Sequence, residues 1–170
     1  EPVEPDKSNV DTTKKLHCTI SIDCATILNN LSDLDPAKLD VLPTDGVVLS
    51  AVTVEFSEGE SVFDVLQRVC RENNIHLEAT FTPGYNSAYV EGIHNLYEFD
   101  CGELSGWMYS VNGWFPNYGC SRYALQDGDV IRWRYTCDLG PDVGGSMVVW
   151  ACTTHFPSCT RRQALLFSPP

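Results

Sequence analysis

The sequence predicts an α+β domain in which one main helix packs on a mostly antiparallel or mixed sheet. Several short segments show the alternation or the β-branched composition of strands, and turn dipeptides separate them. A single segment carries a clear apolar stripe at helical spacing. The length of 170 residues, with 43% hydrophobic residues, fits one domain with a core of ordinary size.

The predicted elements follow one another from residue 16 to residue 136. Strands are expected at 16–22, 47–56, 76–82, 88–93, within 105–113 and at 129–136, and short helical turns between residues 23 and 43. The main helix is expected within 57–74, where Ser61 and Asp64 have capping-box spacing. The helix's apolar stripe consists of Val62, Val65, Leu66, Val69 and Cys70. Tight turns are expected at Pro83–Gly84, Asn112–Gly113 and Asp127–Gly128.

Composition shifts divide the chain into three parts. Residues 1–15 are rich in Pro, Asp, Glu, Lys and Thr, which is typical of a solvated linker. Residues 16–145 hold the predicted elements. Residues 146–170 contain no Asp or Glu and two Arg. They form either a docked strand and loop or a tail outside the domain.

The charge of the chain limits its partners. The net charge of −12 argues against nucleic acid, whose phosphates would be repelled, and against an anionic membrane surface. No run approaches the roughly 18–20 apolar residues that a membrane-spanning helix needs.

The eight cysteines predict disulfides and therefore an oxidising, extracytoplasmic setting. None lies in a CxxC pair, so zinc ribbons and thioredoxin-like sites have no support. The start of the chain, EPVEPDKSNVDTTKK, has no signal-like apolar region, so we expect either a removed signal segment or a larger parent protein. The expected disulfide cysteines, whose pairing stays open, are Cys18, Cys24, Cys70, Cys101, Cys120, Cys137, Cys152 and Cys159.

Three motifs carry a resemblance to a known family. They are SGWMYSVNG at 105–113, FPNYG at 115–119 and LQDGDVIRWRYT at 125–136. With them, residues 16–145 resemble a bacterial domain of unknown function from surface and lipoprotein-like proteins of Gram-positive bacteria. That domain is similar to the C-terminal domain of transcobalamin and intrinsic factor. The resemblance implies a β-grasp-like fold, a mixed sheet packed on one main helix, here expected to be reinforced by disulfides.

An aromatic cluster near the Asn112–Gly113 turn is the candidate binding site. Several rings at a hairpin tip, with polar side chains beside them, make a platform for a flat or saccharide-like ligand. Alternatively, the two strand residues Trp107 and Tyr109 belong to the core, and the loop rings cover it. The candidate ligand-binding residues are Trp107, Tyr109, Asn112, Trp114, Phe115 and Tyr118, with Asn117, Arg122 and Tyr123 close by in sequence.

Metal sites and catalysis have little support. The carboxylates of 127–129 and 138–142 are too few for calcium, and Cys152, His155 and Cys159 lack a fourth zinc ligand. No GxSxG, HExxH, P-loop or dinucleotide fingerprint occurs, and the histidines are scattered. Paired carboxylates such as Asp100 and Glu103 are common on so acidic a chain. We therefore expect no bound metal and no enzymatic activity.

The sequence favours a non-catalytic binding or adhesion module of a larger envelope protein, secreted or on the surface of a Gram-positive cell. Its partner is expected to be a protein, a glycan or a small molecule, with no cofactor. The first alternative is a corrinoid-binding domain with cobalamin as its ligand, which the transcobalamin resemblance implies. The second is a structural spacer. A binding module should expose Trp114, Phe115 and Tyr118 together, whereas a spacer should bury or scatter them.

Overall fold

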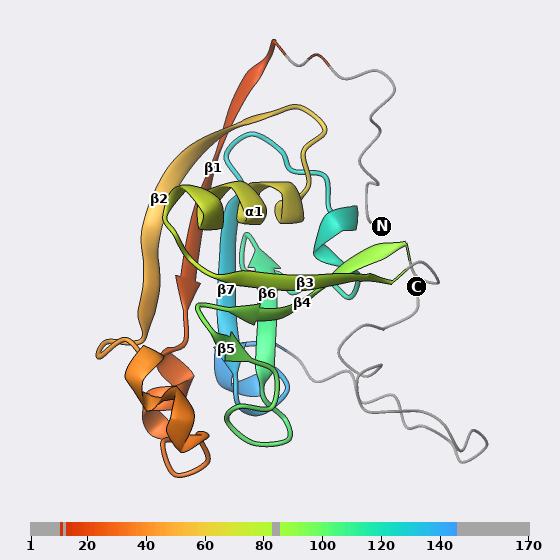
Figure 1. The fold of residues 1–170 in the computed structure, drawn as a ribbon. Coiled ribbons are helices and arrows are strands. Elements are labelled where there is room, and N and C mark those ends of the chain that lie inside the picture. The colour runs from red at the N-terminus through yellow and green to blue at the C-terminus, as the bar shows by residue number, and fades with distance from the viewer. Residues whose placement is uncertain (1–10, 12, 83–85, 146–170) are drawn as a thin grey trace, which may run out of the picture.

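The protein folds into two β-sheets and one α-helix, with short 3-10 helices in the connections (Figure 1). The computed structural model describes residues 11, 13–82 and 86–145. The strands are β1 (Lys15–Asp23), β2 (Val47–Ser57), β3 (Leu77–Thr82), β4 (Ser87–Ile93), β5 (Leu96–Tyr97), β6 (Gly106–Val111) and β7 (Val130–Thr136). The helices are α1 (Val62–Glu72) and the 3-10 turns Ala25–Asn29, Pro36–Val41, Cys120–Arg122 and Pro141–Val143.

The larger sheet has the strand order β2-β1-β7-β6. β1 pairs with β2 antiparallel and with β7 parallel, and β6 pairs with β7 antiparallel. Two register shifts in the β1–β2 pair, on either side of Ile22, leave extra residues on β2. In this strand order β2 forms one edge of the sheet, while β1 and β7 are its central strands.

Alternation along the strands creates the core face of this sheet. Trp107 lies opposite Tyr135 and Tyr109 opposite Trp133, so the β6–β7 pair presents large rings to the interior. Ile20 and Ile22 of β1 continue the same face and are fully buried. Burial of these side chains fixes the register, because a one-residue slip would turn them to solvent.

α1 and the smaller sheet, with the order β3-β4-β5, cover the core face of the larger sheet (Figure 1). α1 begins with a complete capping box, in which Asp64 N–H donates to Ser61 Oγ (3.2 Å) and Ser61 N–H donates to Asp64 Oδ2 (2.8 Å). This confirms the predicted helix start. The five residues of the predicted apolar stripe are all buried.

The expected β-grasp-like fold, one mixed sheet packed on a main helix, is wrong. The strands divide into two sheets, and the chain is mostly β-structure with one α-helix in the described part. An 11-residue helix is only about 16 Å long, too short to cover a four-stranded sheet by itself. The sheet β3-β4-β5 therefore covers the remaining area. Sequence periodicity predicted strands but carries no information on which strands pair.

The expected disulfides are also absent among the described cysteines. Cys18, Cys24, Cys70, Cys101, Cys120 and Cys137 are free thiols, and all but Cys137 are buried. Buried cysteines pack as small apolar side chains, so an even count does not require pairing. Cys152 and Cys159 lie outside the described residues. Separately, none of the helices in the described residues has the length and hydrophobicity to cross a membrane.

Candidate functional site

The candidate site is built on the turn that follows β6. Asn112 and Gly113 both have positive φ (53° and 81°), which two-residue hairpin turns require and which Asn and Gly adopt most easily. Val111 and Trp114 close the turn with two backbone hydrogen bonds, of 2.9 and 3.0 Å. The predicted Asn112–Gly113 turn is confirmed, and it places Trp114 at the surface.

Asn112 ties this turn to the start of β7. Its side-chain Nδ2 donates to Asp129 Oδ1 (2.8 Å), and its Oδ1 accepts from the Val130 N–H (2.9 Å). The buried Asp129 also accepts from the Gln126 N–H through Oδ2 (2.9 Å). Asp127 accepts from the His17 N–H (2.8 Å). The carboxylates of 127–129 are therefore engaged in turn and strand contacts.

Three rings form a row on the surface beyond the turn, which we call the aromatic platform: Trp114, Tyr118 and Tyr123. Trp114 is 52% exposed, and its ring meets that of Tyr118 edge-on at a centroid distance of 6.1 Å. The rings of Tyr118 and Tyr123 stack at 6.0 Å with only 11° between their planes. Both tyrosines are half-buried. Grouped rings of this kind offer an apolar surface for a planar or saccharide ring.

The platform phenols are neutral at neutral pH, and burial moves their pKa further above it. Desolvation raises the pKa of Tyr118 to about 12, and the neighbouring Tyr123 adds to the shift. Desolvation also raises the pKa of Tyr123. At neutral pH both rings are uncharged and retain their O–H donors.

The backbone beneath the platform is held from three sides. The buried Tyr109 donates its O–H to the carbonyl of Tyr118 (2.7 Å), and Val62 at the start of α1 donates its N–H to the carbonyl of Tyr123 (3.1 Å). Ala88 of β4 donates its N–H to Ser121 Oγ (2.9 Å). At Gly119, a Cβ would lie 1.4 Å from Ser87 Oγ, so the loop approaches β4 closely. The rings therefore stand on a fixed support.

The structure separates the six candidate ligand residues into two groups. Trp107 and Tyr109 are each 8% exposed and have internal partners: Trp107 Nε1 donates to the Leu96 carbonyl (2.8 Å). Trp114 and Tyr118 lie in the platform, Asn112 holds the turn, and the half-buried Phe115 lies toward Gly145. Tyr123 belongs to the predicted aromatic cluster but not to the six candidate ligand residues, and the 3-10 turn Cys120–Arg122 brings it back to Tyr118.

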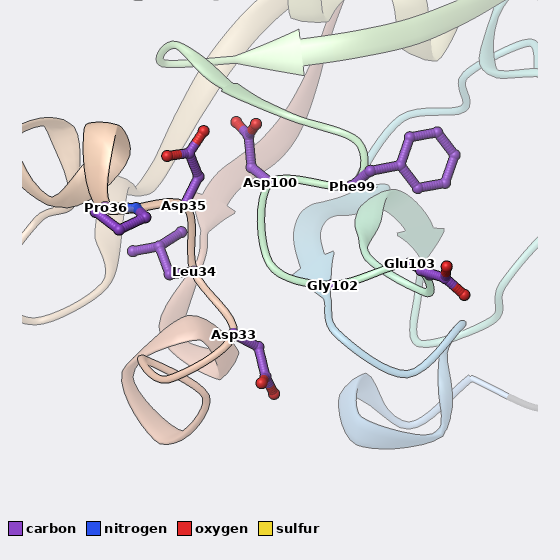
Figure 2. A pocket seen from close by; sticks show the side chains of 8 residues that line it. All are labelled: Asp33, Leu34, Asp35, Pro36, Phe99, Asp100, Gly102 and Glu103. Atoms are coloured by element: carbon purple, nitrogen blue, oxygen red, sulfur yellow. The ribbon is translucent and has the colours of Figure 1, made fainter.

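A pocket lies on another part of the surface, away from the aromatic platform. It has a volume of about 560 Å³ and lies between the loops 33–36 and 99–103 (Figure 2). The Asp35 N–H donates to the Asp100 carbonyl (2.7 Å), which joins the two loops. Asp100 also pairs with Lys38 (3.2 Å). The carboxylates of Asp33 and Glu103 point away from those of Asp35 and Asp100 (Figure 2).

The pocket was not predicted, since Asp100 and Glu103 looked like ordinary surface carboxylates. Its carboxylates do not converge on one point. Across the part of the chain that the structure describes, no three His, Cys, Asp or Glu side chains form a group able to hold a metal ion.

The comparisons with known proteins bear on the fold. Residues 59–137 match the family model of a domain of unknown function, DUF4430. This match spans α1, the smaller sheet, the aromatic platform and β7. It covers a little less than half of the chain. No curated protein sequence matches the chain.

Haptocorrin and a bacterial protein are among the solved structures similar to this chain. Haptocorrin in complex with Cbi has 14% sequence identity and a TM-score of 0.53, over 77% of this chain and 27% of that one. A proposed metal-binding protein of Ruminococcus gnavus ATCC 29149 has 15% identity and a TM-score of 0.42, over 71% of this chain and 96% of that one. The first likeness shows a shared fold with a member of the transcobalamin family. The chain spans only about a quarter of haptocorrin's length.

Proposed function

We propose that the chain is a non-catalytic binding module and that its ligand lies on the aromatic platform. The observation that carries this proposal is the exposed Trp114 ring in edge-on contact with the half-buried Tyr118, which in turn stacks on Tyr123. A spacer has no need to expose a tryptophan over a rigidly supported pair of tyrosines. Exposed apolar groups gathered in this way mark interaction sites.

The platform favours an uncharged ligand with a flat or saccharide ring. Residues 104–121 contain no charged side chain, and Arg122, whose charge acts on Tyr118, is the charged residue next to the platform; the chain as a whole carries a net charge of −12. An anionic ligand would be repelled by the field of the protein, and a cationic ligand finds no carboxylate within this segment. Stacking rings also bind nucleic-acid bases, but such sites need a positively charged groove, which this acidic chain does not favour.

A binding role without catalysis agrees with the state of the thiols. Burial raises the pKa of Cys70 and Cys120 to about 12, so neither forms the thiolate that a cysteine nucleophile requires. An extracellular location remains part of the proposal. It rests on the resemblance to Gram-positive surface domains, since no disulfide joins the described cysteines.

The test is a titration with chitotriose, an uncharged oligosaccharide whose rings have flat apolar faces. Trp114 is much more exposed than Trp107 and Trp133. In a Trp150→Phe background, which removes the fourth tryptophan, we therefore expect saturable protection of Trp114 fluorescence from acrylamide quenching. Trp114→Ala should abolish binding, measured by isothermal titration calorimetry because this variant lacks the fluorescent ring. Phe99→Ala is the matched control, because it removes another exposed ring away from the platform. Binding that survives Trp114→Ala would place the ligand elsewhere and contradict the proposal.

Corrinoid binding is the second candidate, supported by the fold shared with haptocorrin, which was solved with Cbi. A titration with cobinamide, followed by the corrin absorption band, distinguishes it from the first. A saturable band shift that Trp114→Ala removes would favour a corrinoid on the platform. A response to chitotriose alone would favour the saccharide.

A further inference from the structure

The outer edge of β2 is open to another strand. The edge is closed at its C-terminal end, where Arg68 donates to the Glu55 carbonyl (2.8 Å) and the Ser57 N–H donates to Glu60 Oε1 (3.1 Å). At its N-terminal end the Val47 N–H donates to Asp45 Oδ1 (3.0 Å). Between these ends, no described side chain or backbone group outside the β1–β2 ladder bonds to residues 48–54.

This stretch also lacks the usual protection of a sheet edge. Natural edge strands are short, charged, covered or interrupted by proline. β2 has 11 residues, and positions 47–54 contain no charged residue and no proline. Two protective features are present, since the register shifts opposite Ile20–Ile22 and Ile22–Asp23 add one residue near Ser50 and Ala51 and another at Val48. They leave Val52, Thr53 and Val54 in regular pairing with β1.

The other sheet edges differ from β2. β3 has six residues and carries Glu78, which is exposed. β6, at the opposite edge of the larger sheet, is mostly buried. Among the described strands, β2 therefore combines length and exposure with an uncharged stretch of eight residues, 47–54.

Part of the apolar surface at this edge is also left exposed to solvent. Val52 lies opposite Ile20 in the ladder, so both side chains are on the same face of the sheet. Ile20 is fully buried, but Val52 is 38% exposed. A strand added beyond β2 would cover Val52 and extend the core face outward by one strand.

We propose that this edge pairs with the β2 edge of a second copy of the chain, antiparallel, across a two-fold axis. Two copies with a net charge of −12 repel each other, so they can meet only where no carboxylates face one another. Any antiparallel register confined to residues 47–54 places only uncharged side chains opposite each other. The strand is thus complementary to itself, which a two-fold interface requires.

Thr53 provides a specific test of the pairing. Backbone groups of Glu55 and Ser57 point outward, so by alternation the Thr53 N–H also points outward, away from β1. Thr53→Pro removes this donor while leaving the β1–β2 ladder in place, as edge strands tolerate. Thr53→Val is the matched control: both variants lose the hydroxyl contact to Thr19 (3.5 Å), but only the valine keeps the N–H.

Sedimentation velocity of the full chain over a concentration series measures the outcome. We expect a reversible dimer whose dissociation constant is unchanged in Thr53→Val and raised about tenfold or more in Thr53→Pro, which loses one hydrogen bond per copy. Added NaCl should tighten the dimer, because it screens the repulsion between the copies. Far-UV circular dichroism checks that each variant is folded.

Ala51→Lys covers the case in which the proline variant does not fold. Ala51 is exposed, and lysine lowers the net negative charge of each copy, which by itself would favour association. A weaker dimer in this variant would therefore show that the β2 edge forms part of the interface. A parent chain that stays monomeric at every concentration, or a dimer indifferent to both Thr53→Pro and Ala51→Lys, would overturn the proposal.

Discussion

The rings of Tyr118 and Tyr123 stack nearly parallel, with 6.0 Å between their centroids and 11° between their planes, although four residues separate them in the chain. The 3-10 turn Cys120–Arg122 reverses the chain between them. Because both rings stand on backbone that is bonded to β6 and α1, the platform is held in place before any ligand arrives. Such preorganisation lowers the entropic cost of binding.

Tyr109→Phe tests this support directly. The change removes the O–H that donates to the Tyr118 carbonyl (2.7 Å) and keeps the buried ring. We expect a loss of about 1–2 kcal/mol in the free energy of unfolding by urea. We also expect stronger acrylamide quenching of Trp114, because its neighbour Tyr118 becomes less fixed.

Tyr135→Phe is the control for that experiment. Its buried hydroxyl bonds to the Tyr97 carbonyl (2.7 Å) and to Ser105 Oγ (3.0 Å), away from the platform. It should cost similar stability without changing the quenching of Trp114. Equal quenching in both variants would show that Tyr109 does not position the platform.

Asn112 should matter both for its side chain and for its backbone conformation. Asn112→Ala loses the bonds to Asp129 and Val130 and places alanine at φ 53°. We expect a loss of about 2–3 kcal/mol in urea unfolding. Asn112→Gly loses the same bonds but accepts the positive φ, so it should cost less. Equal losses in the two variants would assign the whole effect to the hydrogen bonds.

Gly119→Ala should destabilise the protein for a steric reason alone. Gly119 has φ −63°, which any residue adopts, but a Cβ would lie 1.4 Å from Ser87 Oγ and 2.7 Å from Ser87 Cβ. We expect a loss of about 1–3 kcal/mol in the free energy of unfolding. Adding Ser87→Gly removes both contacting atoms and should recover part of that loss. An additive double variant would contradict this explanation.

Local sequence patterns predicted the elements of this fold well, because helix starts and tight turns depend on residues that are neighbours in the chain. The Ser61–Asp64 spacing predicted the start of α1, and Asn112–Gly113 predicted the hairpin turn. Strand pairing depends on contacts between distant residues. The β-branched segment at 47–56 indicated a strand, yet nothing in it showed that β2 would be an exposed edge.

The candidate site was predictable in the same partial way. The exposure of Trp114 follows from its place just after a tight turn. The burial of Trp107 and Tyr109 follows from the alternation of β6 only once its partner strand is known. The contact between Tyr118 and Tyr123, and the pocket between two distant loops, arise from tertiary structure and leave no local signal.

The free thiols make stability sensitive to alkaline pH. Burial raises the pKa of Cys24, Cys70 and Cys120 from 9.0 to about 12 in the folded chain. Above pH 9 the unfolded chain therefore loses thiol protons that the folded chain retains, and stability falls as pH rises. The stabilisation is complete below pH 9 and is lost between about pH 9 and 12, at about 1.4 kcal/mol per unit for each thiol.

Urea unfolding at pH 8, 9 and 10 measures this loss, and Cys70→Ala provides the comparison. That variant is destabilised at pH 8 by its smaller side chain, but it should lose less stability between pH 9 and 10 than the parent chain. Alkylation after denaturation without a reductant should label all six described cysteines. If any of them stayed unlabelled until reduction, it would be in a disulfide, and its contribution to the alkaline loss would disappear.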